Sequence, residues 1–186
     1  MLDPPHLILL RNRVQIGDSK ESEDGMAEDP NLHPVPVLKD SGLRNLRERW
    51  FTWRTGSDIP LRVAFDPIDF PRQISHMQLG EVVPEANAIR PYDVVMRYVG
   101  TGWVDLFNAP QLTNTRISDL GPIYGERWFS IHDRVIAARE PVMVTGAPYG
   151  VNKDFLEFEI LGLPLSKTGR EVDYVVLALS LLQPFV

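Results

Sequence analysis

An amphipathic helix is the first strongly patterned segment of the chain. Its apolar side chains recur at steps of three and four residues: Leu43, Leu46, Trp50 and Trp53. This spacing predicts a helix over residues 43–54 with one apolar face, and Gly56 predicts its end. A helix of this length is marginally stable alone in water, so that face must be buried. It packs on the sheet of its own chain or on a second copy, and we expect a homodimer through these four residues.

Five later segments carry the pattern of β-strands. They cover residues 76–83, 92–100, 142–147, 155–165 and 172–182. In the second segment, Val94, Met96 and Tyr98 alternate with side chains that face the opposite side, which is typical of a strand. The first two segments predict an antiparallel hairpin, and the turn at 167–170 predicts another. The last segment is apolar on both sides, so we expect it to be central or covered on both faces.

Helical patterns separate the two groups of strands. A short helix is expected over 101–108, a helical turn near 117–120, and a helix of about five turns over 123–139. Pro141 ends the long helix. Two antiparallel groups of strands with helices between them predict an α+β domain over residues 41–186. We expect a five-stranded antiparallel sheet with the helices gathered on one face, preceded by the amphipathic helix.

A proline-rich connector joins the amphipathic helix to the first strand. Pro60 keeps Ile59 out of the helical region and so separates the connector from the helix. Asp66 precedes Pro67, which is the pattern of an N-cap followed by proline at the first helical position. Asp69 adds a second carboxylate in the same turn. The pattern therefore predicts an ordered connector with one short helical turn.

The connector also carries a resemblance to a known family. A helix with two Trp, then Ile-Pro-x-Arg-x-x-Phe-Asp-Pro-x-Asp-x-Pro and a strand, resembles a PAS-domain family found mostly in alphaproteobacteria. Further matches follow in the same order over residues 43–182. The residues that carry the resemblance include Pro60, Arg62, Phe65, Asp66, Pro67, Gly100, Thr101 and Pro164. Asn114 stands where the family is expected to carry Gly, and Asn tolerates a left-handed backbone better than other side chains do.

The resemblance implies a PAS-like fold and a sensory or regulatory role in bacterial signalling. No catalytic output is expected in the chain, which would act through a small ligand, through an unidentified signalling protein, or through both. The expected ligand pocket faces the inner surface of the sheet, and its candidate residues are Tyr98, Trp103, Phe107, Trp128, Phe129 and His132. The same aromatic residues also fit a filled core, because a core and a pocket look alike in sequence.

Two other functions fit parts of the pattern. His132 lies on the long helix from which haem-binding PAS oxygen sensors supply their axial histidine, so a haem gas sensor is one alternative, although the pattern requires no cofactor. A small α+β pocket enzyme such as an isomerase is the other, and it needs a buried carboxylate with a raised pKa. The acidic residues that stand out have simpler roles. Asp66 and Asp69 cap a turn, whereas Glu157 and Glu159 share one solvated strand face.

Motifs of several catalytic and binding classes are absent from the sequence. It contains no cysteine, and therefore no disulfide, thiolate ligand or cysteine nucleophile. It also has no glycine-rich phosphate-binding motif. The four histidines show no metal-ligand spacing, so we expect no metal site. Ser130, His132 and Asp133 are close neighbours on one helix and point in different directions, so they form no catalytic triad.

The chain is acidic, with a formal net charge of −6 and a pI near 5.2. We expect no nucleic-acid partner, because phosphate binding needs clustered Lys and Arg. The early apolar run at residues 7–10 is too short for a membrane span or for the core of a signal peptide. We therefore expect no membrane partner and a cytoplasmic location.

Residues 1–40 are expected to be a disordered tail. The segment 18–29 carries six acidic residues against one lysine and shows no hydrophobic period. Such a segment cannot bury enough apolar surface to offset the entropy of ordering it. We also expect Met26 to be the start of translation, with residues 1–25 an upstream extension.

Overall fold

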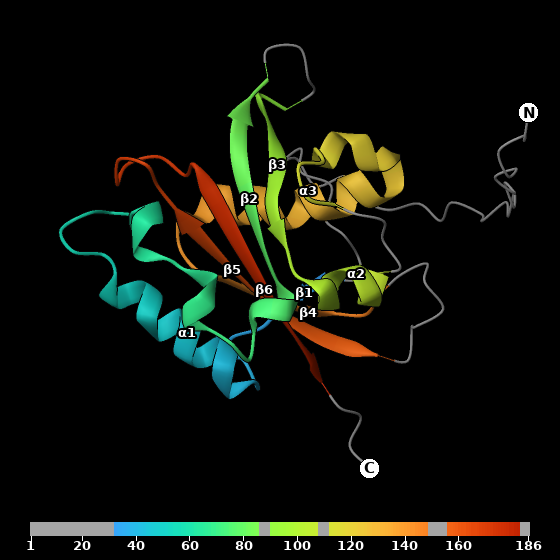
Figure 1. Ribbon diagram of the computed structural model, residues 1–186, viewed down its shortest axis with the longest axis horizontal. Coiled ribbons are helices and arrows are strands. Elements are labelled where there is room, and N and C mark those ends of the chain that lie inside the picture. The colour runs from blue at the N-terminus through green and yellow to red at the C-terminus, as the bar shows by residue number, and fades with distance from the viewer. Residues whose placement is uncertain (1–31, 86–89, 108–111, 149–155, 183–186) are drawn as a thin grey trace, which may run out of the picture.

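The computed structural model describes residues 32–85, 90–107, 112–148 and 156–182. They form a six-stranded antiparallel sheet in the order β1-β4-β5-β6-β2-β3, with helices packed on it (Figure 1). The strands are β1 Leu32–Pro34, β2 Met77–Pro84, β3 Tyr92–Val99, β4 Val142–Gly146, β5 Glu157–Leu165 and β6 Tyr174–Leu182. The helices are α1 Ser41–Thr52, α2 Thr101–Phe107 and α3 Gly121–Ala138, with 3₁₀ turns η1 Arg62–Ala64, η2 Pro67–Asp69, η3 Ile74–His76 and η4 Ile117–Leu120. The fold is α+β as predicted, with one strand more than expected.

The predicted central strand lies at the centre of the sheet. β6 pairs with β5 along its whole length and with β2 over its first five residues, from Tyr174 to Ala178. Its side chains alternate between an inner core and an outer core: Val175, Leu177 and Leu179 in the first, Val176 and Ala178 in the second. All five are buried. Cover on both faces explains why this strand is apolar on both sides.

The helices cover the two faces of the sheet separately. α2 and α3 contribute Trp103 and Ile131, among others, to the inner core. α1 contributes Leu46 and its neighbours to the outer core. α3 approaches the sheet closely at Gly162, where an added Cβ would lie 2.4 Å from a methyl group of Val135. The expectation that the helices share one face therefore holds for α2 and α3, and α1 takes the opposite face.

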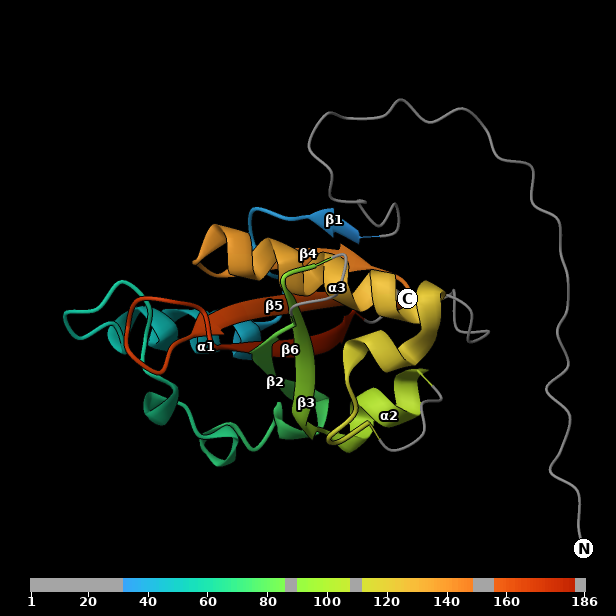
Figure 2. The same cartoon turned by 90° about the horizontal axis from the view of Figure 1, so that it is seen from above.

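The sixth strand comes from the segment predicted to be a disordered tail. β1 pairs with β4 at one end of the sheet (Figure 2), and both Leu32 and Leu38 are buried. The fold therefore includes residues 32–40, which corrects the predicted boundary. Residues 1–31, including Met26, lie outside the described residues. A three-residue strand that ends in proline carries no readable period, which is why the pattern missed β1.

Glu159 attaches this N-terminal segment to the sheet. Its carboxylate accepts hydrogen bonds from the backbone N–H of Lys39, at 2.7 and 2.9 Å, and from that of Asp40, at 3.0 Å. The side chain is 1% exposed. The prediction of a solvated strand face is thus wrong for Glu159 and correct for Glu157, which is exposed. The covering segment lies about 120 residues earlier in the chain, so the local pattern could not reveal it.

α1 packs on the sheet of its own chain. Leu43, Leu46 and Trp50 are fully buried in the outer core. Trp53 is partly buried and packs against two phenylalanine rings of the connector. Leu43, Leu46 and Trp50 are therefore buried within their own chain and not on a dimer surface, whereas Trp53 keeps part of its surface exposed. The homodimer itself stays a prediction.

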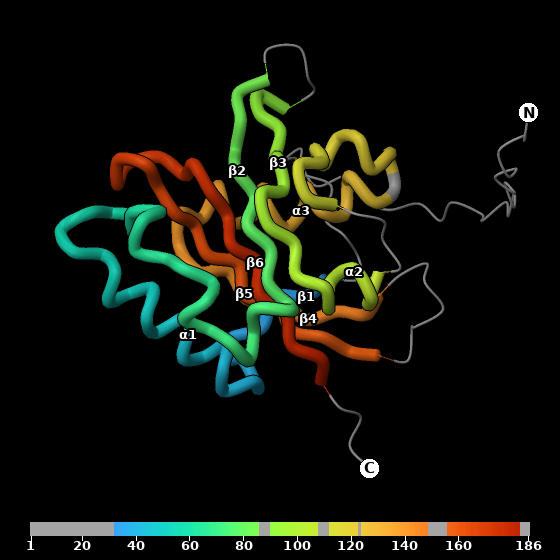
Figure 3. Tube along the Cα trace, viewed as in Figure 1, coloured from blue at the N-terminus to red at the C-terminus, as the bar shows by residue number. Residues whose placement is uncertain are grey.

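The connector forms the predicted turn and bonds to the end of β5. Figure 3 shows it running back along α1 to the start of β2. Asp66 caps η2, because its carboxylate accepts a hydrogen bond from the Ile68 N–H at 3.0 Å. The Arg62 N–H donates to the Ser166 carbonyl at 2.7 Å, and the Ser166 N–H donates to the Pro60 carbonyl at 2.9 Å. Residues of the motif thus fix the connector to the sheet.

Two further residues of the resemblance, and the one position that departs from it, have local structural reasons. Pro164 lies in β5 beyond Gly162, where the pairing with β4 ends, so proline interrupts no ladder on that side. Gly100 faces backbone so closely that an added Cβ would lie 2.3 Å from the Ser75 carbonyl oxygen. Asn114 has a φ of 64°, the left-handed conformation expected of it.

Truncation of Trp50 tests the intramolecular packing of α1. The indole is fully buried, and its Nε1–H donates to the Pro164 carbonyl at 2.8 Å. Trp50→Ala should therefore lower the free energy of unfolding by about 4 kcal/mol, measured by urea denaturation. The neighbouring Phe51 is 40% exposed, and Phe51→Ala should cost less than about 1 kcal/mol. Equal losses in the two variants would contradict this packing.

Neutralisation of Glu159 tests the attachment of residues 32–40. Glu159→Gln places an amide against two backbone N–H donors and removes the charge from their hydrogen bonds, so we expect a loss of about 2 kcal/mol in the free energy of unfolding. Glu157→Gln, on the same strand face but exposed, should change it by less than about 0.5 kcal/mol. Hydrogen exchange at the Lys39 and Asp40 amides should accelerate only in Glu159→Gln.

Candidate functional site

Three of the predicted pocket residues form a filled aromatic core. The rings of Trp103, Phe107 and Trp128 contact one another, with centroids 5.6, 5.0 and 5.1 Å apart. Phe107 also reaches Phe158 of β5 at 6.3 Å. Trp103 and Trp128 are buried, and neither of the two hollows described below is lined by any of the three. The filled-core interpretation therefore applies to these residues.

The remaining aromatic residues of the set lie apart. Tyr98 packs against the outer core, and its hydroxyl donates a hydrogen bond to the Ile74 carbonyl at 2.8 Å. Phe129 faces the Arg90 guanidinium, whose carbon lies 4.4 Å from the ring centroid. The six predicted residues consequently do not line one cavity.

His132 is enclosed between α3 and the sheet. It is 0% exposed, and its Nδ1 lies 2.8 Å from the Trp128 carbonyl, to which it donates. Its Nε2 has no hydrogen-bond partner and would lie 3.2 Å from a Cβ added at Gly80 of β2. Haem ligation needs open space in front of the coordinating nitrogen, and the sheet occupies that space. The residues present around His132 do not fit a haem group.

A hollow of about 470 Å³ lies between β3, η4 and α3, and we call it the inner hollow. Arg90 crosses it. The Arg90 Nε donates to Asp133 at 3.1 Å, and its guanidinium also donates to Glu126 at 2.8 Å. The Tyr92 hydroxyl donates to the other oxygen of Asp133. Burial, followed by this hydrogen bond, raises the pKa of Tyr92 above its ordinary value.

The second arginine of the inner hollow is also paired. Arg116 donates to Glu85 at 2.8 Å and to Asp93 at 3.4 Å. Asp93, which is 3% exposed, further accepts the Ser118 hydroxyl at 2.6 Å. Both arginines and all four carboxylates are therefore engaged with one another or with Tyr92 and Ser118. The inner hollow offers a ligand no charged group that lacks a partner.

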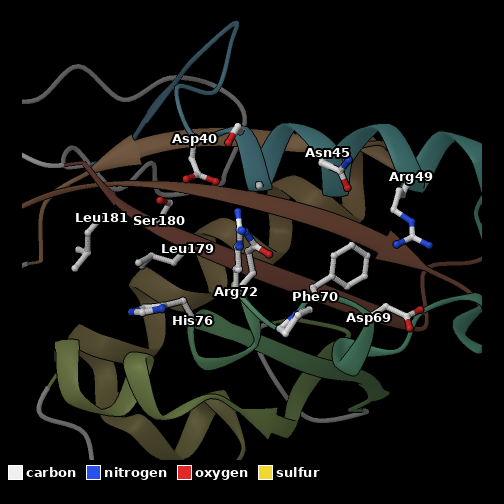
Figure 4. Close-up of a pocket in the computed structure, with 14 residues that line it drawn as sticks. Asp40, Asn45, Arg49, Asp69, Phe70, Arg72, His76, Leu179, Ser180 and Leu181 are labelled. Atoms are coloured by element: carbon white, nitrogen blue, oxygen red, sulfur yellow. The ribbon is translucent and has the colours of Figure 1, made fainter.

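A larger hollow of about 680 Å³ opens on the outer face, and we call it the outer groove (Figure 4). Its walls are α1, the connector and the end of β6. The residues labelled in Figure 4 are Asp40, Asn45 and Arg49 from the α1 side, Asp69, Phe70, Arg72 and His76 from the connector, and Leu179, Ser180 and Leu181 from β6. None of the predicted pocket residues lines it. Its walls come from three segments far apart in the sequence, so no local pattern indicated it.

The outer groove carries charged side chains that are not paired within the described part of the chain. The Arg49 guanidinium lies over the Phe70 ring at 5.2 Å and has no carboxylate partner there. Arg72 is exposed and makes no ion pair among these residues. The Asp40 carboxylate is occupied as the N-cap of α1, accepting the Leu43 N–H at 2.8 Å. Asp69 is exposed at the same end of the groove as Arg49, away from Asp40 (Figure 4).

In comparisons with known proteins, no family model, no curated protein and no solved structure matches the chain. Within the described ranges, no group of three or more His, Asp or Glu side chains is placed to hold a metal ion. No helix in those ranges is long and apolar enough to cross a membrane.

The buried His132 predicts a specific sensitivity to acid. Desolvation lowers its pKa from 6.5 to about 4 in the folded protein. Between these values the unfolded chain binds a proton that the folded chain does not, so stability falls as the pH drops from about 6.5 to about 4. The loss should reach roughly 3 kcal/mol at the lower end.

Urea denaturation of His132→Gln at pH 7 and pH 4.5 measures this contribution, because glutamine does not titrate. We expect the variant to lose less stability than the wild type between the two pH values. His33→Gln, in β1 at an exposed position, is the matched control and should keep the wild-type slope. A slope unchanged in His132→Gln would show that other groups cause the acid sensitivity.

Proposed function

We propose that this chain is a PAS-type regulatory module that acts by binding a signalling protein and performs no catalytic step itself. The observation that carries the proposal is the distribution of space around the sheet. Aromatic rings of α2, α3 and β5 fill the part of the inner face over β5, whereas the outer groove of about 680 Å³ is open. The inner hollow of about 470 Å³ offers a small ligand only charged groups that are already paired with one another. An open groove whose arginines lack carboxylate partners in the described chain suits a protein partner of complementary charge.

The sequence motif and the architecture support the PAS assignment. Residues that carry the resemblance have defined structural roles, such as the cap at Asp66 and the close backbone contact at Gly100. The α+β sheet, with α2 and α3 between its two groups of strands, is compatible with a PAS-like fold. A homodimer belongs to the proposal, formed through surfaces other than the buried face of α1.

The two alternative functions have less support. The haem sensor requires space at the Nε2 of His132 that β2 occupies. The pocket enzyme requires a buried carboxylate that is free to exchange a proton. The buried Asp93, Asp133 and Glu159 each accept hydrogen bonds from several donors of the fold, which is the bonding of structural carboxylates.

Site-specific photocrosslinking in the protein's own cells tests the proposal. A benzophenone amino acid in place of Arg72, in the outer groove, should crosslink the chain to one signalling protein. The same residue in place of Arg170 should give no such adduct, because this exposed turn lies before the first residue of β6, far from the groove. Native mass spectrometry of the purified chain should show polypeptide mass alone. A bound small molecule, or identical adducts from both positions, would overturn the proposal.

A further inference from the structure

The end of β6 in the outer groove has a strand partner on one side only. The pairing with β5 reaches Leu182, the last residue of β6. The pairing with β2 stops at Ala178, opposite Met77, where β2 begins. Residues 179–182 of β6 therefore extend past β2, and Leu179, Ser180 and Leu181 line the groove.

Backbone alternation shows which groups face the vacant side. The Val82 N–H donates to the Asp173 carbonyl, so the odd-numbered residues of β6 direct their N–H and C=O toward β2. Continued along the strand, this alternation directs the backbone groups of Leu179 and Leu181 to the same side. Beside Leu179 that side is approached by η3, which precedes β2, so the vacant side is the one next to Leu181.

The outer edges of the sheet are protected by other means. On β3, the Met96 N–H donates to Thr115 and the Met96 carbonyl accepts the Asn114 N–H, so a loop covers that edge. On the opposite side, β1 covers β4 and is itself only three residues long and ends in Pro34. Short edge strands, proline and covering loops are the usual protections against unwanted strand pairing. The end of β6 has a groove beside it instead.

We propose that the outer groove binds an extended acidic segment of the partner protein, which adds as a strand beside residues 179–182 of β6. Backbone hydrogen bonds to a strand edge are a common mode of peptide recognition. Four residues give an edge of about 14 Å at about 3.4 Å per residue. Arg72 is exposed in the same groove and makes no ion pair within the described chain, and the nearby Asp40 carboxylate is already occupied as the N-cap of α1. This favours acidic side chains on the peptide beside Arg72, at the end of the groove away from Asp69 (Figure 4). This inference rests on the proposed function and specifies the chemistry of the partner.

Synthetic peptides and the full chain test strand addition. The probe is an acidic hexapeptide of alternating Asp and Val, compared with the same peptide N-methylated at the valines and with its Lys-for-Asp counterpart. In an NMR titration we expect the acidic peptide to bind, and the other two to bind at least about tenfold more weakly. The amide proton of Leu181 should exchange more slowly when the acidic peptide is bound, because the added strand covers it.

Charge reversal in the groove provides the matched protein control. The double variant Arg49→Glu and Arg72→Glu should weaken the acidic peptide by about tenfold and strengthen the Lys peptide, whereas Arg170→Glu should change neither affinity. Absence of binding, equal binding of the N-methylated peptide, or unchanged exchange at Leu181 would overturn strand addition.

The outcomes separate this inference from the proposed function. If Arg72 crosslinks to a signalling protein but the peptides fail these criteria, the partner binds the groove by another mode and strand addition alone is wrong. If the crosslink also fails, partner binding at this face is wrong as well.

Discussion

Burial of β6 on both faces is the constraint on which the rest of the structure depends. A strand in this position needs apolar side chains in both directions, and Val175 to Leu179 provide them. Alternate residues belong to different cores, one under α3 and one under α1. β6 therefore lies between α2 and α3 on one face of the sheet and α1 on the other, and it contributes side chains to both cores. Because α1 completes the outer core, the chain buries that face without a second copy.

The same strand also creates the outer groove, because β6 continues after β2 has ended. The start of β2 is set by the close contact at Gly100, whose N–H donates to the Met77 carbonyl at 2.8 Å. The preceding turn η3 packs its backbone against this glycine, and β2 begins directly after it. Gly100, a residue of the sequence motif, thus helps to determine where β2 begins and, with it, where the outer groove lies. The sequence alone does not reveal that groove.

The sequence predicts those parts of the fold whose causes are local. Alternation located the five longer strands, with ends that differ by at most two residues from those observed, and spacing located α1 and α3. Asp66 and Asn114 also have the roles that their local chemistry predicts. The misses concern contacts between distant segments. Leu32 has no periodic neighbours, and Glu159 is covered by Lys39 and Asp40 from the other end of the chain.

The candidate site shows the same limit. The aromatic set on α2 and α3 was correctly placed on the inner face, but only packing distances distinguish a filled core from a pocket. The outer groove escaped prediction because α1, the connector and β6 each contribute a few residues that have no common pattern.

The attachment of β1 also determines how the fold responds to mechanical force. β1 is held by three residue pairs at the edge of the sheet and by the carboxylate of Glu159. When the N-terminal side is pulled, the force acts first on the β1–β4 hydrogen bonds and on those of Glu159, which break one after another. Only then does the force act on β6. β6 is flanked by β5 and β2 and would have to be sheared from both at once. Tension applied through the N-terminal segment would therefore detach residues 32–40 first and leave the other five strands paired.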